Sequence, residues 1–114
     1  MFHSIKIDKD TKLAQIRAND RVNVFGLKDI FLENLGHEDW QAGFNMLREY
    51  SNIENFDVST KDIDDITEWQ VSIDKLIGDG RCAVIASNDS VYGMSRMGEI
   101  LSKNVSNRFV YSVR

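Results

Sequence analysis

The sequence predicts an α/β fold, a sandwich in which a mixed sheet of about five strands is flanked by helices. Segments with alternating or continuous apolar residues, typical of strands, are followed by longer segments in which apolar residues recur every three or four positions, as in amphipathic helices. The first two strand-like segments follow each other directly, which indicates an antiparallel start to a mostly parallel sheet. The predicted order of elements is β-β-α-β-α-β-α-β.

The length and composition predict a single domain over residues 1–114. The chain of 114 residues contains 42% hydrophobic residues, which is enough for one compact core. It contains no proline, and no linker, repeat or low-complexity segment divides it. We therefore treat all predicted elements as parts of one sheet and its covering helices.

The first two predicted strands form a hairpin. In "HSIKID", residues 3–8, Ile5 and Ile7 alternate with polar residues, and "KLAQIRA", residues 12–18, repeats this pattern. Residues 8–11, "DKDT", are turn formers and favour a tight connection between the two strands.

Two amphipathic helices are predicted in the first two thirds of the chain. The first begins after Asn23, a suitable N-cap residue, and ends at Gly36. The second begins at Ser59, which forms a capping-box pattern with Asp62, and its apolar stripe continues to Ile77. The apolar positions are Val24, Leu27, Ile30, Phe31 and Leu35 in the first helix, and Ile63, Ile66, Trp69 or Gln70, Ile73 and Leu76 in the second.

The remaining elements complete the alternation. Residues 42–53 are a strand candidate with polar interruptions, and residues 82–87, "CAVIAS", form the continuous apolar run of a central strand covered on both faces. Residues 91–101 carry apolar residues at helical spacing, and residues 108–113, "RFVYSV", are predicted as the last strand.

The turn after the central strand is a candidate anion site that the sequence does not favour. It lacks both G-x-x-x-x-G-K-[ST] and G-x-G-x-x-G, and the carboxylate of Asp89 would cap the helix and repel a phosphate. Ordinary capping is therefore the expected role of this turn. Gly93 and Gly98, which lower helix propensity, are predicted to allow a close approach of this helix to the sheet.

Charge and cysteine content limit the function classes. The net charge of -4 argues against a general nucleic-acid binder, and the acidic residues of segment 62–68 are expected to form a solvated helix face. Cys82 is the only cysteine, so no intrachain disulfide can form, and its apolar surroundings predict a buried, inert thiol. No signal peptide and no apolar stretch of about 20 residues is present, so we expect a cytoplasmic protein without a membrane span.

No catalytic or metal-binding pattern is found. His3 and His37 lie far apart, and neither has a second ligand at a regular spacing. The chain contains neither H-E-x-x-H nor G-x-S-x-G, so we expect no metal, no cofactor and no enzyme activity. A triad assembled in space from distant residues remains an alternative, because its members need not be neighbours in sequence.

The segment "RCAVIASNDSVYGMSRMGEIL" resembles the penultimate strand and helix of bacterial SpoIIAA-like (STAS/SpoIIAA-type) domains. The run from Ala83 to Ala86 is similar to the family's "vAvVa" strand, and Val91 to Met97 is similar to its "vyGmarm" helix. The order and spacing of the other elements also agree. The chain departs from the pattern at Glu49, where the family has aspartate, and at Ser51, where it has arginine.

The resemblance implies a five-stranded sheet flanked by helices in a protein that is not an enzyme. Related anti-sigma-factor antagonists switch partners when a serine in a "DSSG"-like turn is phosphorylated, and Asp57 and Ser59 of "FDVST" match that turn. The alternative is that Ser59 only caps its helix. The family's C-terminal helix is not matched, so a partner, such as a second copy in a homodimer, would cover the sheet around Phe109 and Tyr111.

The leading functional hypothesis is a non-catalytic, cytoplasmic regulatory or protein-interaction domain. The alternative is a small-molecule or lipid-binding module, since the general fold also resembles lipid-carrying CRAL-TRIO domains. The groove for a small apolar ligand would lie between the helices and would be lined by Phe31, Trp69, Tyr92, Met94 and Met97.

Overall fold

One mixed sheet forms the centre of the molecule. The computed structural model describes residues 2–86, 89, 91–97 and 110–113. The strands lie side by side in chain order and are β1 (Phe2–Asp8), β2 (Leu13–Asn23), β3 (Asn45–Asp57), β4 (Cys82–Ile85) and the short β5 (Val110–Val113). β1 is antiparallel to β2, and every other neighbouring pair is parallel. The predicted α/β class and mixed sheet are confirmed, whereas the SpoIIAA-like architecture stays a prediction.

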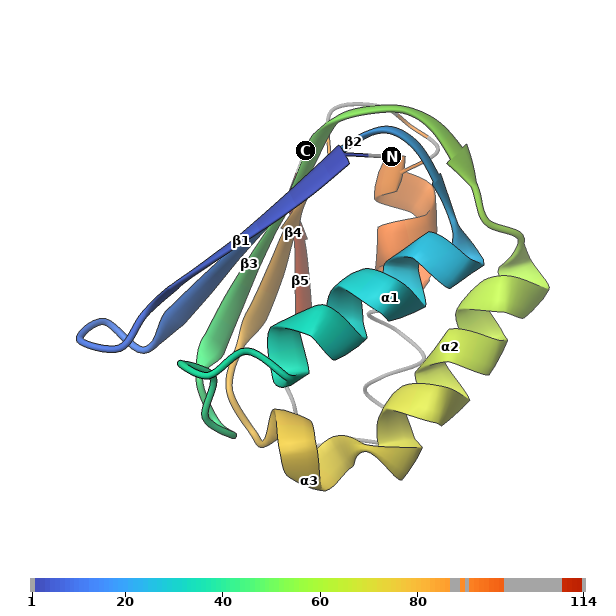
Figure 1. Ribbon diagram of the computed structural model, residues 1–114. Helices are drawn as coiled ribbons and strands as arrows, with labels where there is room; N and C mark the ends of the chain where they lie inside the picture. The colour runs from blue at the N-terminus through green and yellow to red at the C-terminus, as the bar shows by residue number, and fades with distance from the viewer. Residues whose placement is uncertain (1, 87–88, 90, 98–109, 114) are drawn as a thin grey trace.

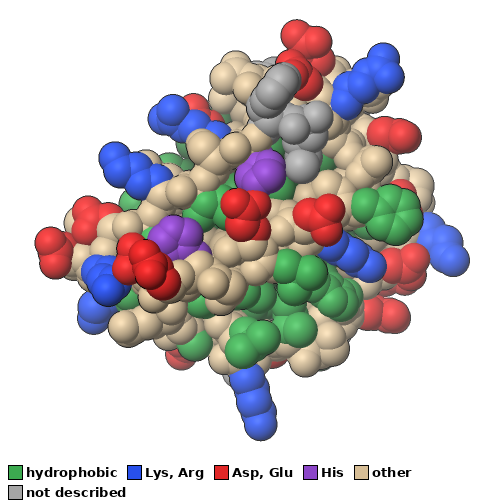
Figure 2. All heavy atoms as spheres, viewed as in Figure 1, with side chains coloured by type: hydrophobic (Ala, Val, Ile, Leu, Met, Phe, Trp, Pro, Cys, Tyr) green, Lys and Arg blue, Asp and Glu red, His purple; other side chains and the backbone are tan. Residues whose placement is uncertain are grey.

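The helices that separate the parallel strands lie on one side of the sheet. They are α1 (Val24–Leu35), α2 (Thr60–Ser72) and the single turn α3 (Asp74–Ile77), and residues 91–97 are also helical. Figure 1 shows α1 and α2 side by side on this side of the sheet, with α3 at one end of the layer. Figure 2, viewed from the same direction, shows the β1 edge of the sheet together with the helices beside it.

The predicted hairpin and helix starts are confirmed in atomic detail. Asp8 Oδ1 accepts hydrogen bonds from the backbone N–H groups of Asp10 and Thr11, which fixes the turn between β1 and β2. Asn23 Oδ1 accepts the Gly26 N–H at 2.8 Å and caps α1. α2 starts with the predicted capping box, formed by Ser59 and Asp62.

Two strands are longer than the alternation of apolar residues predicts. β2 continues to Asn23 rather than ending at residue 18, and β3 continues to Asp57 rather than ending at residue 53. The pairing register shifts between Arg17 and Asn19 and again between Asp20 and Arg21, and Asp20 has a positive φ of 64°. Such irregularities interrupt the two-residue period on which the sequence prediction depends.

The second predicted helix is interrupted before its expected end. α2 ends at Ser72, and Ile73 leaves the helical conformation at φ -113° and ψ 21° before α3 begins. The Ser72 hydroxyl donates to the Trp69 carbonyl, a local bond that competes with the regular helical ladder. As a result Leu76 is 58% exposed while Ile77 is buried.

The prediction that Gly93 allows close packing is wrong. A Cβ atom at Gly93 would meet nothing within 4 Å, and the residue is exposed. The close approach occurs instead at Gly78, where a Cβ atom would lie 2.2 Å from the Gly43 nitrogen and where φ is +78°. The matching prediction for Gly98 falls outside the described residues.

The core lies between the sheet and the helical layer. The predicted central strand is present as β4, which lies between β3 and β5 and buries Cys82 and Val84. Its expected coverage on both faces is not found, because Ala83 and Ile85 on the other face are only half-buried. The other fully buried large side chains come from several elements and include Ile16, Val22, Ile30, Ile53, Ile77 and Val91. Asn34 of α1 is also completely buried, and it is polar whereas these other side chains are apolar.

Candidate functional site

The residues predicted to line an apolar groove pack against the core. Phe31 is buried and meets the half-buried Trp69 edge to face, with ring centroids 5.9 Å apart. Tyr92, Met94 and Met97 are half-buried and also contact the core. The two hollows described below are lined by other residues, so ligand binding among these five side chains stays a prediction.

The predicted regulatory serine is placed as a helix cap. Ser59 Oγ accepts the Asp62 N–H at 3.1 Å, while Asp62 Oδ2 accepts the Ser59 N–H at 3.0 Å. Ser59 is exposed, and the exposed Asp57 precedes it at the end of β3. The capping role is confirmed, and phosphorylation of Ser59 stays a prediction.

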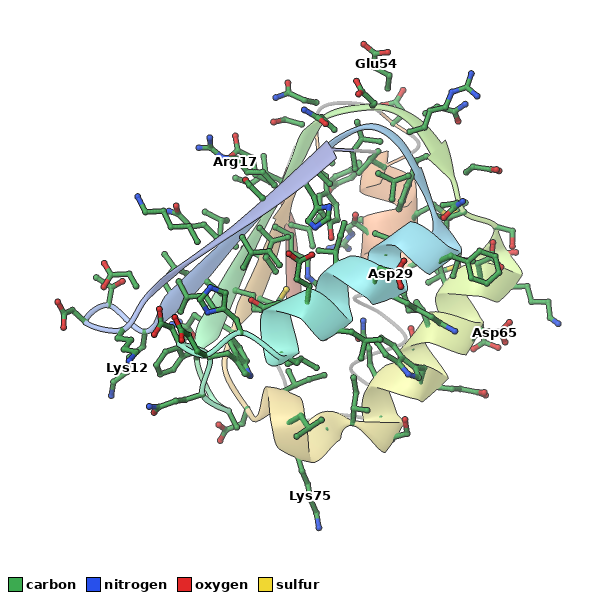
Figure 3. All side chains as sticks on the ribbon, in the orientation of Figure 1. Lys12, Arg17, Asp29, Glu54, Asp65 and Lys75 are labelled. Atoms are coloured by element: carbon green, nitrogen blue, oxygen red, sulfur yellow. The ribbon has the colours of Figure 1, made fainter. Side chains whose placement is uncertain are left out.

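Two polar hollows of about 340 Å³ each are found along the strands. One lies where β2 and β3 end and α1 begins, and it is lined by Arg21, Val22, Asn23, Gly26, Asn55 and Asp57. The other lies beside the register shift of β2 and is lined by His3, Ser4, Arg17, Ala18, Asn19, Glu49 and Asn52. Within the second hollow, Arg17 Nε donates to Glu49 Oε2 at 2.8 Å, and Arg17 projects away from the helical layer in Figure 3.

The outer face of α1, defined here by Phe25, Asp29, Leu32 and Glu33, is the most exposed apolar surface on a described helix. Phe25 is 72% exposed and Leu32 is 52% exposed. Because they are seven positions apart, they lie on the same side of α1, opposite the buried residues of this helix. Figure 2 shows hydrophobic and acidic side chains together on this side of the molecule, and Figure 3 shows Asp29 on α1.

A polar cluster lies beneath α1, on the face of β3 that the helices cover. Asn34 Nδ2 lies 4.0 Å and Arg48 Nη2 lies 3.9 Å from the Met46 sulfur. The Arg48 guanidinium carbon lies 4.3 Å from the centroid of the Phe31 ring. Burial raises the pKa of the nearby Tyr50 above its ordinary value of 10.0, although the Arg48 charge acts in the opposite direction.

This cluster was not predicted from the sequence, although the sequence contains a signal for it. Met46, Arg48 and Tyr50 follow each other at the two-residue period of a strand, so the buried Met46 and Tyr50 place Arg48 on the same covered face. Asn34 lies seven positions after the buried Leu27 and therefore on the inner side of α1.

The histidines and the cysteine have simple surroundings. His37 Nδ1 accepts the Asp39 N–H at 3.0 Å, and His3 pairs with Glu33. Among the described residues, no group of three His, Cys, Asp or Glu side chains could hold a metal ion. Cys82 is buried as predicted.

In the described part of the chain, no helix combines the length and apolar character that a bilayer crossing requires.

Comparison with known proteins identifies no relative: no family model, no curated protein and no solved structure matches this chain.

Proposed function

We propose that this chain is a non-catalytic interaction domain that binds a partner protein through the outer face of α1. The observation that carries the proposal is the exposure of Phe25, 72%, and Leu32, 52%, on one side of a well-capped helix. Large aromatic and aliphatic side chains of this kind are the usual anchors of protein interfaces. A rigid helix presents them without a large loss of conformational freedom on binding.

The charges around these anchors favour a basic partner. Asp29 lies on the outer face of α1 itself, where Glu33 already pairs with His3 and the Lys28 ammonium lies over the Trp69 ring. The neighbouring α2 carries further exposed carboxylates at Asp64, Asp65 and Glu68. The chain as a whole has a net charge of -4. Two copies of this acidic face would repel each other, so the partner is expected to carry lysine or arginine beside an apolar segment. The homodimer expected from the sequence would use the sheet near Tyr111 instead.

Photocrosslinking in the source cells tests this proposal. A photoreactive phenylalanine analogue replaces Phe25 in one variant and Lys6, an exposed residue of β1, in a control variant. We expect one protein species to be captured repeatedly from position 25 and not from position 6. Addition of Leu32→Glu to the first variant should lower the yield about tenfold, because a carboxylate replaces an interface anchor.

The result would contradict the proposal if both positions captured the same proteins, or if Leu32→Glu left the yield unchanged. Circular dichroism of the Leu32→Glu variant serves as the folding control. Because Leu32 is already 52% exposed, its unfolding midpoint should remain close to that of the wild type.

A small apolar ligand held by Phe31, Trp69, Tyr92, Met94 and Met97 is the alternative function. The edge-to-face contact of Phe31 with Trp69 supports it, because this contact places two aromatic rings together between α1 and α2. Native mass spectrometry of protein purified from the source cells would reveal a co-purified ligand. The interaction domain is favoured because its exposed anchors are already accessible.

A further inference from the structure

Two buried polar atoms beneath α1 have no hydrogen-bond partner within the described part of the chain. They are Asn34 Oδ1, an acceptor, and Arg48 Nε, a donor. Both side chains reach the same sulfur atom of Met46, at 4.0 Å and 3.9 Å, but a thioether is only a weak acceptor. One unsatisfied acceptor and one unsatisfied donor therefore belong to two side chains that meet at one sulfur atom.

Among the residues that the structure describes, no carboxylate forms an ion pair with Arg48, in contrast to His3, Lys9 and Arg17, which each have one. The Phe31 ring at 4.3 Å stabilises the guanidinium but does not neutralise it. A half-buried cation on the covered face of a sheet costs stability unless a negative group approaches it.

We propose that Arg48 and Asn34 form a binding site for a small organic carboxylate that has an apolar body and a hydrogen-bond donor next to the carboxylate, as in a 2-hydroxy acid. The carboxylate accepts from the Arg48 guanidinium, which supplies the missing charge. The hydroxyl group donates to Asn34 Oδ1, which is completely buried, so α1 moves away from β3 when the ligand enters. The apolar body lies against the Phe31 ring and the neighbouring apolar side chains.

The surroundings favour this class over an inorganic anion. Ile16 and Val84 are the register partners of Arg48 on both sides, and both are buried. A phosphate dianion would lose a large hydration energy in such surroundings, and a single guanidinium cannot replace it. A singly charged carboxylate with an apolar body loses less and gains from the apolar contacts. Arg48 is only half-buried, so part of it is open to solvent.

Three matched probes test the site on the full chain by isothermal titration calorimetry. Phenyllactate carries both polar groups, phenylpropanoate lacks the hydroxyl, and phenylpropanol lacks the carboxylate. The wild type should bind phenyllactate about fivefold more tightly than phenylpropanoate, and phenylpropanol most weakly. Arg48→Met should weaken both carboxylates about tenfold and leave phenylpropanol unchanged. Asn34→Leu should reduce the affinity for phenyllactate to that for phenylpropanoate.

Arg17→Met is the control, because Arg17 lies on the neighbouring strand, faces away from the helices and already has a carboxylate partner. It should leave all three affinities unchanged. The proposal is overturned if the wild type does not bind phenyllactate, if it binds the three probes equally, or if Arg48→Met binds the carboxylates as tightly as the wild type. Should Asn34→Leu fail to fold, the Arg48→Met comparison decides the question. This site is separate from the outer face of α1, so either proposal can fail alone.

Discussion

The covered faces of β2 and β3 are neighbours in one sheet, yet they differ in chemistry. On β2 this face consists of Ala14, Ile16 and Ala18, all nearly inaccessible to solvent. On β3 the buried Met46 and Tyr50 flank the half-buried Arg48. The register places Ile16 directly beside Arg48. One strand thus presents an apolar surface to the helices, and the adjacent strand presents a cation.

This difference separates residues that stabilise the fold from residues that cost stability. Apolar burial on β2 contributes about 25 cal/mol for each Å² removed from water. At β3, Arg48 Nε and the facing Asn34 Oδ1 of α1 are buried without partners among the described residues, and each such group costs about 1–3 kcal/mol. A protein that needed only a stable core would gain from an apolar residue at position 48, so this cation is a candidate for function.

The largest expected effect is at Ile16. Ile16→Ala removes a side chain that is 1% exposed and leaves a cavity between β2 and the helices, so we expect the free energy of unfolding to fall by about 2–5 kcal/mol. Urea denaturation measures the change. Leu32→Ala on the exposed side of α1 is the control and should change the free energy by no more than about 0.5 kcal/mol. Equal effects at the two positions would remove the distinction between the core and the helix surface.

The next effect concerns Tyr50 and appears only at high pH. Burial raises the pKa of Tyr50 in the folded state above 10.0, so the unfolded chain loses this proton first as the pH rises. The Tyr50 contribution is therefore complete below pH 10, and above it the free energy of unfolding falls by up to about 1.4 kcal/mol per pH unit. Urea denaturation between about pH 9 and about pH 11 should show a smaller decrease in the free energy of unfolding for Tyr50→Phe than for the wild type. Identical slopes would mean that Tyr50 ionises equally easily in both states.

The sequence predicted the β1–β2 hairpin more completely than β3 for a physical reason. Ile5 and Ile7 alternate with polar residues, so the hairpin follows from the two-residue period, although Leu13 and Ile16, predicted to repeat it, are three positions apart and lie on opposite faces of β2. On β3 the same period includes Arg48, and a charged residue in an alternating pattern is normally assigned to the solvent face. The period of Met46, Arg48 and Tyr50 is compatible with a covered Arg48, and the structure, which places Phe31 over the guanidinium, decides between the two faces.

Helix boundaries were predictable where a local side-chain bond defines them. Asn23 and Ser59 cap their helices through residues three positions further along the chain, so the pattern is readable in the sequence. The end of α2 at Ser72 was not predictable, because the apolar stripe continues through Ile73. The outer face of α1 was also missed, since an exposed Phe25 becomes evident only when the buried side of the helix is known.

A smaller effect, and one of opposite sign to the Ile16 change, is expected at position 48. Arg48→Met replaces a partly buried, unpaired cation by an apolar side chain, and we expect the free energy of unfolding to rise by about 1 kcal/mol. Thermal denaturation at neutral pH without added ligand measures it. A loss of stability would show that the contact with Phe31 outweighs the cost of burying the charge.

The smallest effect is expected on the opposite face of the same two strands. There Arg17 of β2 and Glu49 of β3 form an ion pair at 2.8 Å, but the Arg17 side chain is 68% exposed and the Glu49 side chain 35%. Water and salt screen such a pair, so Glu49→Gln should lower the free energy of unfolding by only about 0.2–1 kcal/mol. Urea denaturation at low and high salt should show this difference shrinking as the ionic strength rises, because the interaction is exposed. A difference that persists in high salt would instead mean that Glu49 holds β2 and β3 together through its packing. Packing would then contribute to stability at the exposed Arg17–Glu49 pair as well as at the covered Arg48, and the two faces of these strands would differ less than their surroundings indicate.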